Sequence, residues 1–349
     1  MITGHDIAED GGYSRSDTET ELMMCCRDLL RIISVPLRFS LMSGVLFTLS
    51  TAERTAGQSK TPLNACSTAL PEVSVRIAER ARAALREIFN TEENWVGIHA
   101  AEVMVEVGEG AWVDRALRTK LFTWESSQFR IGAWRVLALT APPLERDMWR
   151  ERIERVFLDP QSPDRWQALE SLAKLHHRLS AEAAVAAEAL AVSSAGNDLV
   201  VLPLWALAVS GVPEARAQLL ASLESEEPNM RRRSAYALAR VHPRSPEIRD
   251  RVFRAAEIES VDTIAYPYLL SAAVKLAVAS ASSSPRRAEL VKLTSRADAK
   301  VKFEALQALS PQSTIADLPW ALSFLDHPHG DVRAGAALMV LRILNPTSS

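Results

Sequence analysis

A pair of apolar positions recurs eight times along the chain and constrains its fold more than any other feature. In each copy a small residue is followed four residues later by a larger apolar residue, and successive copies lie 31–38 residues apart. Residues four apart share one face of an α-helix, so the small side chain admits a neighbouring helix while the larger one fills the space beside it. The small positions are Ala100, Ala133, Ala168, Pro203, Ser234, Ala272, Ala305 and Ala336.

A second amphipathic segment lies between successive copies, for example at residues 143–158, 180–192 and 246–256. Several of these segments begin with Ser or Pro, which favour the first positions of helices. Alanine and leucine are abundant and β-branched runs are few, so helix propensity is high throughout. A single helix pair cannot bury its apolar face, whereas stacked pairs form a continuous core. We therefore predict an all-α fold with about eight helix pairs over residues 72–345.

The best copies share a further pattern, in which a basic residue precedes the small one by three positions. It is clearest at residues 331–336, where Asp331, Val332 and Arg333 precede Ala336, and it returns at residues 228–234 and 159–168. This pattern resembles the HEAT repeat, especially its short bacterial form. The resemblance implies a right-handed α-solenoid of the armadillo type with a concave binding face. It implies no single activity, because such folds serve many tasks.

The first 71 residues differ in character from the repeats. Residues 1–22 are polar and acidic, and we expect them to be disordered. Residues 23–52 combine a basic flank, a short apolar core and small residues, which is the pattern of a secretory signal peptide; an amphipathic helix packed on the body is the alternative. The signal peptide would make the protein exported or periplasmic, which we favour over cytoplasmic. The apolar core is too short to span a bilayer, so we expect no transmembrane helix, and residues 53–71 are predicted to be a linker.

The stretch from Asp326 to Asp331 contains His327 and His329 and suggests a metal site when it is taken alone. In the other copies the same position is a loop between paired helices. We therefore interpret the histidines as loop residues and Asp331 as a carboxylate at the start of a helix. There a carboxylate interacts favourably with the exposed backbone N–H groups. The three cysteines, Cys25, Cys26 and Cys66, all precede the repeats, so no cysteine-based zinc site can hold the array.

No motif for nucleophilic, metal-dependent or nucleotide-dependent catalysis is present in the sequence. We therefore predict no catalytic, metal or cofactor site, and a non-enzymatic scaffold that binds a protein partner. The net charge of −3 and the pI near 6.2 argue against nucleic acid as the partner. The alternatives are a HEAT-like DNA-binding protein of the glycosylase type and a HEAT-like lyase.

The candidate partner contacts are a basic group and two aromatic residues. Arg231, Arg232 and Arg233 are consecutive, and Arg240 lies two helical turns beyond Arg233 on the same face, so we expect a patch for an acidic partner. The alternative is a solvated or ion-paired helix that faces the acidic residues Glu224, Glu226 and Glu227. Six of the eight tryptophans fall between residues 95 and 166. Among these we expect Trp124 and Trp149 at an exposed binding surface, where aromatic residues are favoured.

Overall fold

The computed structural model describes residues 63–277, 285–295 and 298–345, and within them every regular element is a helix. The chain divides into two units, Met1–Leu63 and Asn64–Ser349. The described helices belong to the second unit, apart from the first residue of α2. The predicted disordered segment (1–22) and the predicted signal peptide or amphipathic helix (23–52) lie outside the described residues. Of the predicted linker, residues 63–71 form the start of α2 rather than a loop.

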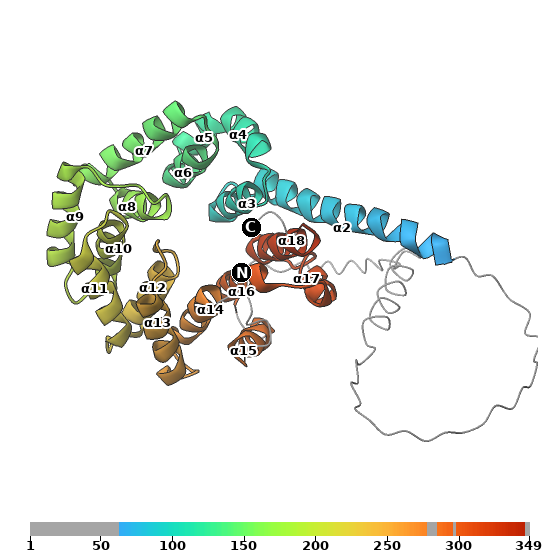
Figure 1. The fold of residues 1–349 in the computed structure, drawn as a ribbon. Coiled ribbons are helices and arrows are strands. Elements are labelled where there is room, and N and C mark those ends of the chain that lie inside the picture. Colours follow the sequence, from blue (N-terminus) through green and yellow to red (C-terminus); the bar gives the residue numbers. More distant parts are fainter. Residues whose placement is uncertain (1–62, 278–284, 296–297, 346–349) are drawn as a thin grey trace, which may run out of the picture. The chain divides into compact units, whose positions relative to one another are not determined.

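The helices alternate between an inner and an outer position along the chain (Figure 1). The outer helices are α2 (Leu63–Thr91), α4 (Gly110–Thr119), α5 (Leu121–Glu125), α7 (Pro143–Leu158), α9 (Ala181–Ser193), α11 (Pro213–Ala221), α13 (Pro246–Ile258), α15 (Pro285–Thr294) and α17 (Leu318–Leu322). The inner helices are α3 (Trp95–Glu106), α6 (Arg130–Thr140), α8 (Arg165–Lys174), α10 (Val201–Val209), α12 (Pro228–Leu238), α14 (Tyr266–Leu276), α16 (Ala299–Leu309) and α18 (Gly330–Leu344). Short 3₁₀ turns precede α10 and α17 (Asp198–Val200 and Ile315–Asp317) and follow α11 and α16 (Ser222–Glu224 and Ser310–Gln312).

The recurring small residues all lie on inner helices and are all buried. Ala100, Ala133, Ala168, Ser234, Ala305 and Ala336 are fully buried, and Ala272 and Pro203 nearly so. The apolar residues four positions later, from Met104 to Val340, are buried as well. The repeat spacing therefore predicted which face of each of these helices packs against its neighbours. At this level the all-α prediction is confirmed.

Helix starts follow the local sequence. Ser180, Ser245 and Asp298 each accept a hydrogen bond from a backbone N–H in the first turn of α9, α13 and α16. Such caps satisfy donors that have no partner within the helix. Among the described helices, none is long and apolar enough to cross a membrane.

The inner helices contact one another in chain order, from α3 and α6 through to α16 and α18, and α18 in turn packs against α3. A solenoid has two terminal helices, but here the first and last inner helices meet, so the helices close into a ring (Figure 1). We call the contact between α18 and the α2–α3 pair the seam.

The seam joins residues more than 230 positions apart in the sequence. The Nδ1 of His99 lies 2.9 Å from Oδ1 of Asp331, which accepts a hydrogen bond from it. The His99 ring also stacks on Phe303 of α16, with 5.1 Å between the ring centroids. Further ion pairs join Arg80 to Asp326, Arg333 to Glu87 and Arg342 to Glu106. At the start of α18, Gly330 lies directly against Val96 and Ile88. The seam is therefore packed at its centre and ion-paired around it.

Candidate binding cavity

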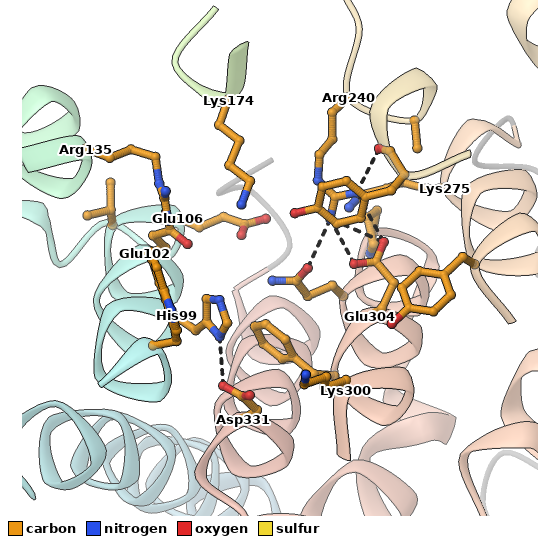
Figure 2. A pocket seen from close by; sticks show the side chains of 18 of the residues that line it. His99, Glu102, Glu106, Arg135, Lys174, Arg240, Lys275, Lys300, Glu304 and Asp331 are labelled. Carbon is orange, nitrogen blue, oxygen red and sulfur yellow. Dashed lines mark hydrogen bonds and ion pairs between the residues drawn. The ribbon is translucent and has the colours of Figure 1, made fainter. Parts of the chain in front are cut away.

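The inner helices enclose a central cavity of about 1420 Å³. Its wall carries charged and aromatic side chains that lie on, or close in sequence to, the inner helices other than α10 (Figure 2). The charged lining residues are Glu102, Glu106, Arg135, Lys174, Arg240, Arg244, Lys275, Lys300, Glu304, Asp331 and Arg342, and the aromatic ones are Trp95, Phe129, Tyr236, Tyr268 and Phe303. The cavity is thus neither an apolar core void nor a simple acidic or basic channel.

On one side of the cavity, Arg135 and Glu102 form a buried ion pair. The Arg135 Nε lies 2.5 Å from Glu102 Oε1, and Nη1 donates a 2.8 Å hydrogen bond to Ser171. Burial alone would raise the pKa of Glu102, but the nearby charges of Arg135 and Lys174 outweigh it and lower this pKa to about 2. Glu102 is therefore a carboxylate at any physiological pH, and it fixes the Arg135 side chain in place.

On the other side, Arg240 pairs with Glu304 and stacks on Tyr236. Arg240 Nη2 lies 2.9 Å from Glu304 Oε2, and its guanidinium carbon is 3.6 Å from the centre of the Tyr236 ring. Lys174 approaches the same ring at 5.6 Å, so Tyr236 links the two cationic sides. Burial would raise the pKa of Glu304, but Arg240 and Lys275 overcome this and lower it.

Lys275 differs from the other cations in this wall. Burial disfavours its charged form, and the neighbouring Arg240 adds repulsion, so its pKa falls to about 8. The carboxylates of Glu304 and Glu106 act in the opposite direction but do not compensate. Lys275 is therefore only partly protonated slightly above neutral pH.

The predicted basic patch is not a single exposed surface. Arg231 binds Glu259 through two nitrogens at 2.6 and 2.7 Å and also donates to the Ser225 carbonyl. Arg233 lies 2.5 Å from Asp198. Arg231 and Arg233 are thus ion-paired within the protein, as the alternative interpretation had it.

Of the remaining two arginines of the predicted patch, Arg232 contacts a residue of the cavity wall and Arg240 is part of the wall. Arg232 stacks on Tyr268, with its guanidinium carbon 5.5 Å from the ring centre, and Tyr268 lines the cavity. Arg240 lines the cavity itself. The structure therefore separates the four arginines, and Arg240 is the member that belongs to the candidate site.

The predicted exposure of the two tryptophans was wrong. Trp124 is 2% exposed and Trp149 is 5% exposed, and both pack within the continuous core. The Trp124 ring lies against the backbone of α3 near Gly97, and Trp149 packs under the guanidinium of Arg152. These large rings fill space between helix pairs, which removes them from any surface contact in the folded chain.

His327 and His329, in the stretch from Asp326 to Asp331, lie directly before the start of α18. His329 Nδ1 accepts a hydrogen bond from the backbone N–H of Asp331, and His327 Nδ1 accepts one from the N–H of His329. Among the residues that the structure describes, no group of three or more His, Cys, Asp or Glu side chains could hold a metal ion. The adjacent His176 and His177 diverge, as their spacing indicates: His177 pairs with Glu154, and His176 contacts the ring of His242.

Most residues of the cavity were not identified from the sequence, although a signal for them exists. The residues two and six positions after each small residue lie about one helical turn apart. They occupy the helix face next to the face that packs against the neighbouring helix. At these positions the inner helices carry Glu102 and Glu106, Arg135, Lys174, Tyr236 and Arg240, Gln307, and Arg342, all of which line the cavity. Polar residues at a fixed offset from a packing position therefore mark the inner face.

No family model, curated protein or solved structure matches this chain. The fold and the cavity themselves define the class, which is a closed ring of helix pairs around a charged central cavity.

Proposed function

We propose that the protein is a non-enzymatic interaction module that binds a segment of a protein partner in its central cavity. The observation that supports this is the cavity itself, about 1420 Å³ and lined by charged and aromatic side chains (Figure 2). Pockets for small molecules usually enclose about 300–1,000 Å³. The larger volume favours a stretch of polypeptide over a small metabolite.

The arrangement of the wall also suits recognition. Arg135, Arg240 and Arg342 are each held by a carboxylate of the protein, which fixes their donors in position before a partner arrives. Side chains that are already ordered lose less conformational entropy on binding. We further propose that the helix pairs are HEAT-like repeats with the right-handed superhelical sense of that family, here continued until the ends meet.

Filling the cavity should abolish binding without unfolding the ring. Leu139 lines the cavity and is 38% exposed, so Leu139→Trp adds a bulky ring to the open space rather than to the core. Peptides selected from a displayed random library on the wild-type protein should bind this variant at least about ten-fold more weakly, which corresponds to about 1.4 kcal/mol. Isothermal titration calorimetry measures the change.

The matched control is Val185→Trp on the outer helix α9, where the side chain is 65% exposed. It should leave peptide affinity unchanged, and both variants should retain the wild-type circular dichroism spectrum. Selected peptides that bind Leu139→Trp as tightly as the wild type would exclude the cavity as the binding site. Retardation of duplex DNA by the wild type at about 150 mM salt would instead favour the DNA-binding alternative.

A further inference from the structure

The charges of the cavity wall do not balance. Four of its basic groups are neutralised by carboxylates of the protein, in the pairs Arg135–Glu102, Lys174–Glu170, Arg240–Glu304 and Arg342–Glu106. The Asp331 carboxylate lies 2.9 Å from the His99 ring. Lys275, Lys300 and Arg244 also line the cavity, and within the described ranges no carboxylate oxygen lies within 4.0 Å of their charged nitrogens. The wall therefore carries surplus positive charge, although the whole chain has a net charge of −3.

Lys275 is the most informative of these cations. It projects from the end of α14 on the same side of the cavity as Arg240 (Figure 2). Arg244 lies beside it and approaches the Lys275 carbonyl, with Nη1 3.5 Å away. The charged groups that act on its ammonium are Arg240 and Arg244, which repel it, and Glu304 and Glu106, which attract it. A partly desolvated ammonium between two guanidinium groups is costly unless an anion joins it.

Lys300 is a second cation of the wall that has no carboxylate partner among the described residues. It lies near the start of α16, where it is exposed, and it lines the cavity. Arg135 does not supply such a point, because its side chain is 3% exposed and its Nη2 is buried. Figure 2 shows Arg135 and Lys174 on one side of the cavity and Arg240 and Lys275 on the other.

We infer that the bound segment is acidic, with one carboxylate placed at Lys275 and Arg244 and a second at Lys300. This inference rests on the proposed function, because it names the chemistry of the segment that the cavity would accept. Two cationic points on successive inner helices, α14 and α16, suit a peptide with Asp or Glu residues separated along its length.

The probe is a displayed library of random peptides, selected in parallel on the wild type and on Lys275→Met. Wild-type selection should enrich Asp and Glu over their frequency in the unselected library, and this enrichment should be lost on Lys275→Met. A synthetic copy of the best wild-type peptide should bind Lys275→Met about ten-fold more weakly, as expected for the loss of one charge-assisted contact. Lys292→Met is the matched control, because Lys292 is an exposed lysine of α15 that does not line the cavity.

The pH dependence gives a second readout that a merely structural role for Lys275 would not produce. Because the pKa of Lys275 is about 8, the amine loses its proton as the pH rises through that value. The affinity of the wild type for an acetylated, histidine-free peptide should therefore fall between about pH 7 and pH 9, and the affinity of Lys275→Met should change little.

Two results would overturn this inference while leaving the proposed function intact. One is that selection on the wild type yields peptides that are not enriched in Asp and Glu, although these peptides bind Leu139→Trp more weakly than the wild type. The other is equal affinity of the best peptide for the wild type and Lys275→Met. If no peptide is enriched, or if Leu139→Trp binds the selected peptides normally, the proposed function itself fails.

Discussion

Ala305→Glu is expected to lower the free energy of unfolding by at least about 3 kcal/mol. Ala305 is fully buried on α16, which packs against α14 on one side and α18 on the other. A methyl group is all that this helix crossing accommodates. A glutamate there must either be buried without a counter-charge or force the neighbouring inner helices apart, and both outcomes are costly.

Ala189→Glu on the outer helix α9 is the matched control, because Ala189 is exposed and the change adds the same side chain and charge. It should shift the unfolding midpoint in urea only slightly. An unchanged midpoint for Ala305→Glu would contradict the assignment of the small positions as packing sites, and with it the repeat register.

Gly330→Ala is expected to destabilise the seam by about 1–3 kcal/mol, which is the usual cost of adding a methyl group to a closely packed site. A Cβ at this position would lie 2.5 Å from Cγ1 of Val96 and 3.3 Å from Cγ2 of Ile88. Both neighbours belong to the first helix pair, so relief of the clash must rotate the Val96 side chain within the packed seam or move α18 away from α3. Amide hydrogen exchange should therefore become faster in these two helices before it does so elsewhere.

Gly110→Ala provides the comparison, because Gly110 is also the first residue of its helix, α4. A Cβ there would meet only Thr140, at 3.7 Å, which is an ordinary contact. This substitution should be neutral or slightly stabilising, since alanine restricts the unfolded chain more than glycine does. Equal effects at the two glycines would mean that α18 is not closely packed at the seam.

The inner layer of the fold was predictable because its signal is periodic. A small residue with an apolar residue four positions later is a local pattern, and burial of these positions from Ala100 to Ala336 follows from helix geometry alone. The alternation of inner and outer helices follows from the amphipathic segments between the copies. Exposure of single tryptophans was not predictable in the same way, because it depends on which neighbouring helices cover each ring, and both Trp124 and Trp149 are covered in the continuous core.

Closure of the ring could not be predicted from the repeat pattern. It depends on small rotations between successive helix pairs, which add up over the whole array. No local sequence pattern indicates the size of these rotations. The residues that seal the seam, such as Arg80 with Asp326 and His99 with Asp331, are far apart in the sequence and unremarkable in isolation. The stretch that begins at Asp326 was interpreted as the start of a helix, and its additional role at the seam becomes visible only when α18 lies beside α3.

The chemistry of the cavity depends on that closure. Glu106 and Arg342 belong to the first and last inner helices and line the cavity as a pair. Without the seam, the charged residues of the inner face would lie on an open concave surface, where water would screen them. Enclosure is what lowers the pKa of Lys275 and leaves the surplus positive charge available for a ligand.

Site-directed cross-linking across the seam tests the ring most directly. Arg80→Cys and Asp326→Cys are introduced together after Cys25, Cys26 and Cys66 are replaced by serine, and a short bismaleimide is added. The side chains of Arg80 and Asp326 form an ion pair at 2.6 Å, so the account predicts an intramolecular cross-link in the monomer, identified by mass spectrometry. The pair Arg80→Cys and Ala189→Cys should not cross-link, because α2 and α9 lie on opposite sides of the ring (Figure 1). Failure of the first pair to cross-link, with both cysteines shown to react with a single maleimide, would contradict the closed ring and the cavity that it encloses.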